Sequence, residues 1–467
     1  MESSSHNRRD CWLLAAIIAI AAVLRFWHIG GESLWLDEGA SVGIARLPWS
    51  AFLKLMYERE ANMVLYYVLL RGWMVFGTSE AWLRALSAVF SVATIPFVYV
   101  IGREVRSRAT GFVAALLFAL SPFSIAYAEE IRSYSLVCLL VSAATWFLLR
   151  RRWTLWAWAI ALAVYAHFFA MLVLASHVLY LVITRYPLRD LRTVFSKLAL
   201  ALIPALGFVL LRNTGQLTWI PPLSVAQIQQ AFGEWAGGGD LALIVIFLAV
   251  LGAVITWRRP IATNPTLVIW LWLLVPVVVI VVVSVARPLL VSRFLILSLP
   301  ALLIAAGIAL TEVPKPISVM LLLAIAFFSV RTELLAWRTP SKDDLRGASA
   351  YVLQRSSTED GIIFHIPMAR HAFEYYARRQ RASNVPGLMS PSHGPRATER
   401  DFQADGDAEL VAKLWKKPPV LWLMLTRNES NGQPDEYTNF VMSKVKEVYA
   451  QCEDRQFRGV LVRRCTR

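Results

Sequence analysis

Charged side chains are scarce in this chain of 467 residues, where Asp, Glu, Lys and Arg make up 17% and hydrophobic residues 57%. Soluble domains average about a quarter charged residues and about half apolar ones. The scarcity lies in the first 330 residues, because the remainder has an ordinary globular composition. This distribution excludes a soluble enzyme, a disordered chain and a fibrous repeat.

Cysteine is also rare, with four residues. Cys11 and Cys138 fall inside apolar segments, where they are expected to be small core residues. Cys452 and Cys465 lie on two strand-like runs, 446–452 and 458–465. They can form a disulfide if this part of the chain faces the outside, but spacing does not fix their distance, so both states stay open. None of the four has the spacing of a metal site.

Long apolar runs recur from Cys11 to about Val330. A helix needs about 20 apolar residues to cross a bilayer. We therefore predict an α-helical polytopic membrane domain over residues 1–330, with about 11 transmembrane helices, and a soluble domain over 331–467. The predicted spans are 12–28, 86–102, 110–127, 134–149, 153–165, 168–184, 198–211, 241–257, 265–285, 294–310 and 317–330.

The net charge of +15 is placed like a topology signal. Residues 331–467 carry 22 basic and 17 acidic residues, and the preceding residues carry 25 and 15. Most of the excess lies in short loops between predicted spans, which is not the pattern of a nucleic-acid-binding face. Basic loops face the cytoplasm, so the alternate loops and the C-terminal domain are expected outside. The first span has no small-residue cleavage site and is not expected to be a cleaved signal.

Two adjacent carboxylates, Asp37 and Glu38, follow the first predicted span closely, with Trp35 beside them. Carboxylates near a bilayer are costly unless they are hydrated, paired or used in function. They can also be an acidic pair that opens the next helix, because acidic residues suit a helix N-terminus. Both interpretations stay open.

The rest of the first outside loop predicts an amphipathic helix that begins near Pro48. This helix fits the membrane interface and fits equally well a lid packed on other helices. The tyrosines Tyr66 and Tyr67 follow it and suit the headgroup level. The apolar residues that recur at helical spacing are Trp49, Phe52, Leu53 and Met56.

Further ionisable residues gather in the outside turns. Glu130 and Arg132 either close a turn as an ion pair or face an anion and a hydroxyl group. His167 lies among aromatic residues, where a lone histidine is more often structural. Arg287 and Arg293 flank the last outside turn and either extend toward lipid headgroups or bind a lipid phosphate. The loop over 212–240 reads as an irregular, flexible cover.

The order and spacing of these segments resemble the bacterial family 39-like membrane glycosyltransferases of the GT-C superfamily, which are relatives of protein O-mannosyltransferases and aminoarabinose lipid A transferases. The resemblance covers about 300 residues, and no single motif is specific. Lys342–Arg346 and Phe373–Tyr376 also look like the extracytoplasmic domain of such proteins. The segments that carry the resemblance are Ser33–Glu38, Leu65–Tyr67, Ser79–Arg84, Ser121–Tyr134, Tyr165–Phe169 and Arg293–Pro300.

The resemblance implies a GT-C fold in the inner membrane and transfer of a sugar from a polyprenyl-phosphate donor to an acceptor on the outer side, usually with inversion. Asp37 matches the first-loop acidic residue that acts as base or positions the acceptor, with Glu38 beside it. Glu130, Arg132 and His167 match polar positions of later outside loops. Where many relatives have His-Pro-Pro, this chain has Asn62-Met63-Val64, so no role for that histidine carries over.

Physical chemistry favours the same site. A lipid-linked donor stays in the membrane while its sugar phosphate reaches water, so the reaction belongs at the span ends. Arginines stabilise the leaving phosphate and a carboxylate takes the acceptor proton; Arg132, Arg287 and Arg293 are candidates for the phosphate. Trp35, Tyr66 and Tyr67 are candidates for the acceptor or the interface. No separated Asp-X-Asp pair lies in the first loop, so no metal or other cofactor is expected.

A lipid-sugar flippase or another transporter is the main alternative, and a lipid-binding scaffold is a weaker one. Transport favours ionisable residues in the middle of spans, where this sequence has almost none. The C-terminal part predicts a small α/β domain. Its expected elements are helices over 342–355, 370–379 and 408–415 and strands over 361–366 and 420–425.

Overall fold

The computed structural model describes residues 2–211, 220–257, 264–390, 417–426, 429–430, 433–434 and 436–467. The chain forms two compact units, and the first contains most of the helices. The second combines the C-terminal part with two segments of the first loop, which lies between α1 (Glu2–Phe26) and α5 (Glu80–Val105). The first unit comprises Met1–Ile29, Glu58–Tyr66 and Arg84–Thr339, and the second comprises Gly30–Tyr57, Tyr67–Leu83 and Pro340–Arg467.

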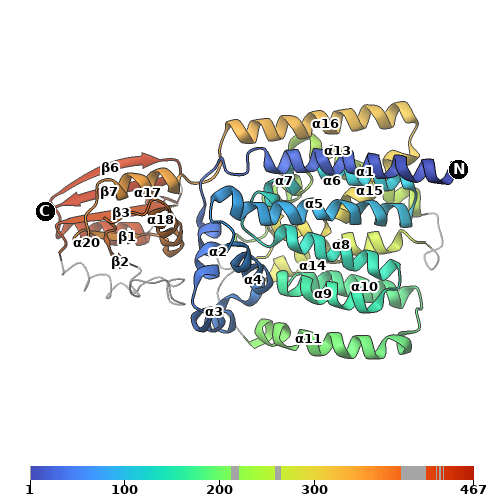
Figure 1. Ribbon diagram of the computed structural model, residues 1–467, viewed down its shortest axis with the longest axis horizontal. Helices are drawn as coiled ribbons and strands as arrows, with labels where there is room; N and C mark the ends of the chain where they lie inside the picture. Colours follow the sequence, from blue (N-terminus) through green and yellow to red (C-terminus); the bar gives the residue numbers. More distant parts are fainter. Residues whose placement is uncertain are drawn as a thin grey trace. The chain divides into compact units, whose positions relative to one another are not determined.

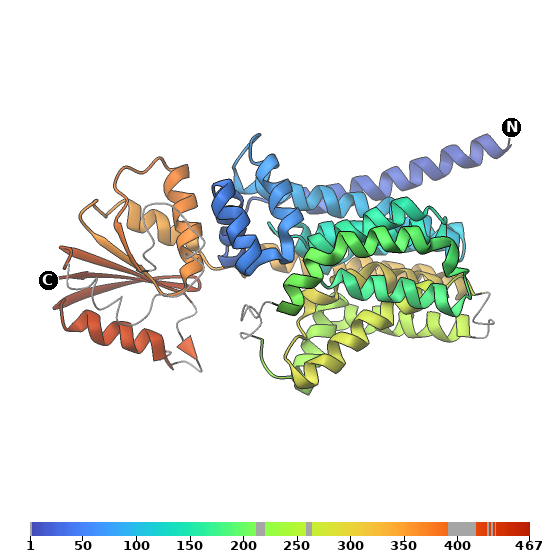
Figure 2. The same cartoon turned by 90° about the horizontal axis from the view of Figure 1, so that it is seen from below.

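Long apolar helices run side by side in the first unit (Figures 1 and 2). Each of the eleven predicted spans falls on one of these helices, or on two that follow one another. The helices are α1 (Glu2–Phe26), α5 (Glu80–Val105), α6 (Arg108–Leu120), α7 (Pro122–Ala128), α8 (Tyr134–Leu149), α9 (Trp153–Ala166), α10 (Ala170–Ile183), α11 (Arg192–Leu211), α12 (Val225–Trp235), α13 (Gly239–Trp257), α14 (Leu267–Ala286), α15 (Leu299–Glu312) and α16 (Lys315–Arg338), with 3-10 turns over Leu188–Leu191 and Ser292–Ser298.

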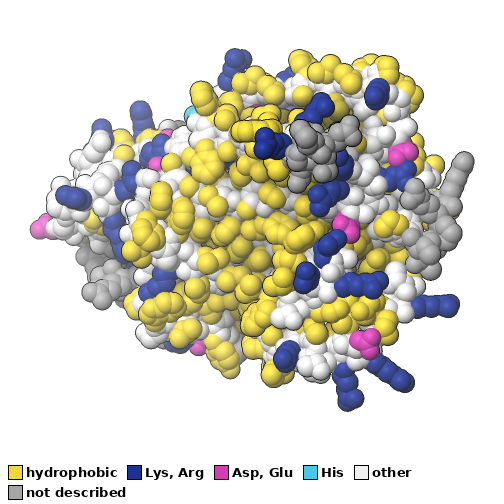
Figure 3. All heavy atoms as spheres, turned by 45° about the vertical axis from the view of Figure 1, so that its right-hand side comes forward, with side chains coloured by type: hydrophobic (Ala, Val, Ile, Leu, Met, Phe, Trp, Pro, Cys, Tyr) yellow, Lys and Arg dark blue, Asp and Glu magenta, His cyan; other side chains and the backbone are white. Residues whose placement is uncertain are grey.

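Six helices in the described ranges are long and apolar enough to cross a membrane, or up to seven if the bent pair α6 and α7 is one span. The apolar helices α8, α9 and α10 are shorter. Apolar side chains gather over much of the surface in Figure 3, and exposed examples include Leu211, Val250 and Phe327. The chain is therefore a multi-pass membrane protein, as predicted.

Helix α15 forms the centre of the first unit, and every residue from Leu299 to Leu310 is buried. It packs against α6 and α13. A Cβ atom at Gly252 of α13 would overlap the carbonyl oxygen of Ala305. Small residues allow helix backbones to approach closely in membranes, so Gly252 sets this packing distance.

A bend of 57° separates α6 from α7 at Ser121–Pro122. Pro122 has no N–H group to donate to the carbonyl of Phe118, four residues earlier. The buried Arg25 of α1 supplies donors instead, to the carbonyl oxygens of Phe118 at 3.0 Å and Ala119 at 2.9 Å. The guanidinium also donates to the hydroxyl of Ser124 at 2.9 Å. Arg25 thus satisfies the backbone groups that the bend exposes.

The second unit contains a five-stranded mixed sheet with strand order β2-β1-β3-β7-β6. Strands β2 and β3 run parallel to β1, whereas β7 is antiparallel to both β3 and β6. The predicted small α/β domain is therefore present. Its elements are α17 (Leu345–Leu353), β1 (Gly361–Phe364), α18 (Pro367–Arg379), β2 (Gly387–Ser390), β3 (Val420–Thr426), β4 (Glu429–Ser430), β5 (Gln433–Pro434), α20 (Glu436–Lys446), β6 (Gln451–Phe457) and β7 (Val460–Thr466).

Cys452 and Cys465 are cross-strand neighbours on β6 and β7 and form a disulfide. The predicted strand over 446–452 is wrong in position, because α20 continues to Lys446 and β6 begins at Gln451. Packing of Val441 and Val445 on the sheet favours the helix there. The predicted helix over 408–415 lies outside the described residues.

The first-loop segments contribute α2 (Leu36–Arg46), α3 (Trp49–Leu55) and part of α4 (Val64–Trp73), and a π-helical turn over Met56–Glu60 precedes α4 in the chain. The predicted amphipathic helix is present as α3. The predicted apolar stripe is divided between two surfaces. Phe52 of α3 and Met56, which follows the helix, are buried, whereas Trp49 and Leu53 are exposed. One face of the helix therefore packs inside the protein, and another face exposes apolar side chains at the surface.

Candidate active site

Asp37 and Glu38 lie in the first turn of α2, where the helix dipole favours negative charge. Glu38 is fully buried, and its Oε2 accepts a hydrogen bond from the backbone N–H of Trp35 at 3.4 Å. The same carboxylate lies 3.6 Å from the Nζ atom of Lys342. Asp37 is only half-buried. The capping interpretation thus fits Glu38, and Asp37 is the more accessible of the two carboxylates.

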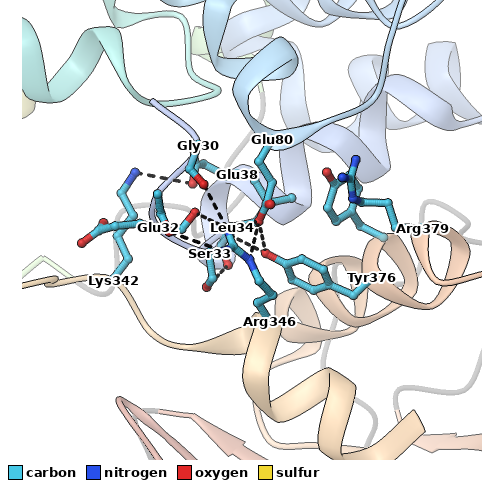
Figure 4. Close-up of polar contacts among 12 residues, drawn as sticks. Gly30, Glu32, Ser33, Leu34, Glu38, Glu80, Lys342, Arg346, Tyr376 and Arg379 are labelled. Carbon is cyan, nitrogen blue, oxygen red and sulfur yellow. Dashed lines mark hydrogen bonds and ion pairs between the residues drawn. The ribbon is translucent and has the colours of Figure 1, made fainter. Parts of the chain in front are cut away.

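A polar network in the second unit holds the loop before α2 (Figure 4). The hydroxyl of Tyr376 donates to Glu80 Oε1 at 2.5 Å and accepts from the N–H of Leu34 at 2.8 Å. Arg346 donates to Glu80 Oε1 at 2.8 Å and to the carbonyl oxygen of Glu32 at 2.8 Å. Burial and the Glu80 carboxylate raise the pKa of Tyr376. These side chains therefore position the segment that leads to Asp37.

A second group of polar residues lies in the first unit, at the turns that precede α8, α10 and α15. The ring of His167 lies 6.1 Å from the ring of Tyr134 and 5.6 Å from that of Phe294. The guanidinium of Arg132 lies 6.0 Å from the Tyr134 ring, and that of Arg293 lies 5.9 Å from the Phe294 ring. The structure therefore brings together three residues that lie far apart in the sequence.

Glu130 belongs to the same group. Glu130 and Arg293 both act electrostatically on Tyr127, whose ring lies 4.9 Å from the ring of Tyr134. One carboxylate and two guanidinium groups therefore share an aromatic setting that limits their access to water. We term this group, which consists of Glu130, Arg132, His167 and Arg293, the phosphate cluster.

His167 is uncharged in this setting. Burial, with the positive charges of Arg132 and Arg293, lowers the pKa of His167 to about 3. Its Nδ1 atom accepts from the N–H of Phe169 at 3.3 Å, so the neutral ring carries its proton on Nε2. His167 can donate one hydrogen bond, and the positive charge of the cluster comes from the arginines.

Asn62 replaces the histidine that many similar sequences have, and it has a structural partner here. Its Oδ1 atom accepts from the N–H of Phe168 at 2.9 Å. Asn62 therefore holds the turn that carries His167. The replacement is visible in the sequence, but this contact is not, because the two residues are far apart in the chain.

Glu234 of α12 also lies near the cluster, because its Oε2 accepts from the hydroxyl of Ser292 at 2.6 Å, next to Arg293. The prediction of an irregular cover over 212–240 is wrong for residues 225–235, which form α12. Ser224 caps this helix by accepting from the N–H of Gln227 at 3.1 Å. That serine was the sequence signal for the helix.

The other predicted site residues lie in varied settings. Arg287 is exposed at the end of α14, and Trp35 is half-buried. Tyr66 and Tyr67 are fully buried, and the hydroxyl of Tyr66 is hydrogen-bonded to Ser87 Oγ at 2.8 Å. Within the described residues, no group of three or more His, Cys, Asp or Glu side chains is placed to hold a metal ion.

Comparison with known proteins supports this architecture. The model of a family described as dolichyl-phosphate-mannose-protein mannosyltransferase matches residues 61–210, which is less than half of the chain. No curated protein matches the sequence.

Solved structures match over almost the whole chain. ArnT from Cupriavidus metallidurans in the apo state superposes with a TM-score of 0.67 and 13% identity, over 96% of this chain and 97% of that one. ArnT bound to undecaprenyl phosphate gives 0.64 and 14%, over the same shares. The Archaeoglobus fulgidus oligosaccharyltransferase with a tethered acceptor peptide gives 0.55 and 10%, over 89% and 69%.

These matches confirm the fold that the sequence resemblance predicted. The chain has the fold of the GT-C membrane glycosyltransferases, and part of its membrane region matches a mannosyltransferase family model.

Proposed function

We propose that this protein transfers a sugar from a polyprenyl-phosphate donor to an acceptor hydroxyl group at the outer side of the cytoplasmic membrane, with its C-terminal domain on that side. The observation that carries the proposal is the phosphate cluster, where Arg132 and Arg293 flank an uncharged histidine in an aromatic setting at helix ends. The structural relative ArnT has been solved with undecaprenyl phosphate, which supports a lipid phosphate as the ligand.

In the proposed reaction the acceptor oxygen attacks the anomeric carbon, and the bond from that carbon to the phosphate oxygen breaks. The electron pair leaves with the polyprenyl phosphate, whose negative charge Arg132 and Arg293 stabilise. The acceptor proton passes to the carboxylate of Asp37, the general base. One direct displacement inverts the configuration at the anomeric carbon.

The setting of the two adjacent carboxylates favours Asp37 as the base. Glu38 is buried, accepts a backbone hydrogen bond and pairs with Lys342, so its charge already has structural partners. Asp37 lies one residue earlier on a different face of α2, because successive helical residues are rotated by about 100°. The partly exposed Asp37 is accessible to an acceptor.

The two carboxylates provide a matched test. We expect Asp37→Asn to lower transfer by at least about a hundredfold, since a general base contributes about 10² to 10⁴, without changing the melting temperature. Glu38→Gln is expected to lower the melting temperature, because Lys342 loses its counter-ion. Purified full-length protein is assayed with radiolabelled polyprenyl-phosphate sugars and membrane acceptor extract. Full activity in Asp37→Asn would show that another group is the base.

The same preparation distinguishes transfer from transport. In liposomes, the proposed reaction forms a new glycosidic bond and consumes the labelled donor. Movement of intact donor across the bilayer without a new bond would favour a flippase and contradict the proposal.

We further propose that the reaction needs no metal ion. The leaving lipid monophosphate carries less charge than a nucleotide diphosphate, and the two arginines of the phosphate cluster can neutralise it. Transfer is therefore expected to be unchanged, within a factor of about two, after dialysis against EDTA. A loss of activity that Mg²⁺ or Mn²⁺ restores would overturn this part of the proposal.

A further inference from the structure

A pocket between α2 and α18 of the second unit is not used by the proposed transfer chemistry. Its volume is about 410 Å³, which is within the usual range for small-molecule sites. The charged and aromatic part of its lining consists of Arg46 from α2 and of Glu374, Tyr375 and Arg378 from α18. The pocket is therefore large enough for a small organic molecule and contains groups that can recognise one.

Helix packing explains why the pocket forms. A Cβ atom at Gly39 would lie 2.9 Å from the backbone nitrogen of Ala372, and one at Gly43 would lie 2.5 Å from Nδ1 of His371. Two glycines four positions apart on one helical face therefore let α2 approach α18 closely. Arg46 continues the same face three residues later, and its long side chain does not fit so close a contact. The space beside Arg46 stays open as the pocket.

Positive charge exceeds negative charge around the pocket. Glu374 already has a close partner, since Arg370 Nε lies 2.5 Å from its Oε1, whereas Arg378 lies 3.7 Å from its Oε2. The guanidinium of Arg46 lies 5.7 Å from the Tyr375 ring, and within the described residues it makes no ion pair. The one carboxylate of the lining is therefore held by a third arginine, which leaves the charges of Arg46 and Arg378 largely uncompensated.

The electrostatics around Arg46 favour an anion. Burial and the positive charge of Arg378 lower the pKa of Arg46. His371 adds no positive charge, because burial and the charges of Arg370 and Arg378 lower its pKa to about 3. A bound anion would offset the repulsion between the two arginines of the pocket. Arginine pairs with phosphates and carboxylates through its planar fork of N–H groups, so the pocket suits one of these groups.

The rest of the lining is largely apolar. Val42 lies on α2, and Leu47 and Pro48 follow that helix directly. The ring of Tyr375 adds an aromatic surface. An inorganic ion leaves these surfaces uncovered, whereas an organic anion covers them and removes apolar area from water. The lining thus favours an anion that carries an apolar or aromatic body.

The pocket is separate from the proposed catalytic base. Asp37 and Arg46 both belong to α2 and lie nine residues apart. Nine residues correspond to a rotation of about 180° around the helix axis, so the two side chains point to opposite sides of α2. A ligand of the pocket therefore contacts α18 and not Asp37.

We propose that this pocket binds a small soluble organic anion, a phosphate ester or a carboxylate, which bridges α2 and α18. The inference goes beyond the proposed transferase function and does not depend on it. A ligand that binds only the folded protein stabilises the folded state. An occupied pocket therefore joins the first loop to the C-terminal part through the ligand, in addition to their direct contacts.

Hydrogen exchange on the full-length protein in detergent tests the pocket, with phenyl phosphate as the probe. We expect phenyl phosphate to slow exchange in residues 36–46 and 367–379. In Arg46→Gln and Arg378→Gln, the concentration that gives half of this protection is expected to rise at least about fivefold, because each variant loses a charge-assisted hydrogen bond to the anion. Arg455→Gln removes an arginine from an exposed position of β6 and is the matched control.

Two pocket variants are used because Arg46 is partly buried. The Arg378 side chain is 54% exposed, so its replacement is not expected to disturb the fold, and exchange measured without ligand checks this. Equal protection of the wild type, Arg46→Gln and Arg378→Gln would overturn the inference. Absence of protection in the wild type would overturn it as well.

Two further probes test the class of ligand. Inorganic phosphate is expected to protect both helices only at higher concentration, since it does not cover the apolar part of the lining. Benzyl alcohol is expected to give no protection, since it carries no negative charge. Equal protection by benzyl alcohol and phenyl phosphate would overturn the assignment to an anion, and equal affinity for inorganic phosphate would overturn the assignment to an organic one.

A lipid headgroup is the other source of the same anion. In nanodiscs of phosphatidylcholine, phenyl phosphate is expected to protect both helices as it does in detergent. Protection of the wild type, but not of Arg46→Gln, by nanodiscs of phosphatidylglycerol without phenyl phosphate would assign the pocket to a lipid and contradict the inference.

Discussion

At the residue scale, neighbours in sequence have different environments. Asp37 and Glu38 are equivalent in the sequence, and both suit a helix N-terminus. In the structure Glu38 is buried against Lys342, more than 300 residues later in the chain, and Asp37 is partly accessible. The sequence predicted the acidic pair, but it did not predict that Glu38 is the buried member beside Lys342, because that contact depends on a distant part of the chain.

His371 gives a prediction on pH. Its folded pKa of about 3 is below the ordinary value of about 6.5, so the unfolded chain binds the proton more readily. This stabilisation is present above about pH 6.5 and is lost as the pH falls toward 3. Between pH 7 and pH 5 the loss is about 2 kcal/mol.

The charged groups near His371 are Arg370, Arg378 and Glu374 of α18 and Arg46 of α2, and His371→Gln leaves all four in place. We expect the variant to lose less stability than the wild type between pH 7 and pH 5, as measured by chemical unfolding of the full-length protein in detergent. Equal losses in both proteins would mean that His371 is not buried as a neutral group.

At the scale of elements, the bend between α6 and α7 depends on a side chain from a third helix. The sequence predicted one span over 110–127 and did not single out Arg25. The structure shows that Arg25 donates to the carbonyl groups at the bend. A buried carbonyl group without a donor costs about 1 to 3 kcal/mol.

Replacement of Arg25 by Met is therefore expected to destabilise the membrane unit by about 1 to 3 kcal/mol, since the carbonyl of Ala119 loses its donor, whereas that of Phe118 keeps the N–H of Ser121. Arg331→Met removes the same charge from an exposed position of α16 and serves as the control. Thermal unfolding in detergent measures both variants. A melting temperature for Arg25→Met equal to that of the control would contradict the role assigned to Arg25.

At the scale of the whole molecule, two segments of the first loop and the C-terminal part share one compact unit. Glu80, Arg346, Tyr376 and the N–H of Leu34 form the polar centre of that unit. The segment around Asp37 is therefore held by residues that lie far apart in the sequence. The resemblance pointed to Glu80, Arg346 and Tyr376 as parts of familiar motifs but did not give their contacts.

Arg346→Ala tests this arrangement. We expect a loss of about 1 to 2 kcal/mol, because hydrogen bonds to charged groups contribute this much and partial exposure of Arg346 reduces their strength. Hydrogen exchange is expected to rise together in residues 30–46 and 345–379. Arg355→Ala, at an arginine that lies on the Tyr351 ring, is the control, and increased exchange in the C-terminal part alone would contradict a shared unit.

The sequence by itself determined that the chain is a multi-pass membrane protein, where its long apolar helices lie, and which ionisable residues lie between them, because hydrophobic runs and loop charges are local properties. Only the tertiary structure decided which ionisable groups are neutral, paired or accessible, because burial and long-range contacts set these states. Arg132, His167 and Arg293 come together through the packing of separate helices. Such contacts have no local signature in the chain.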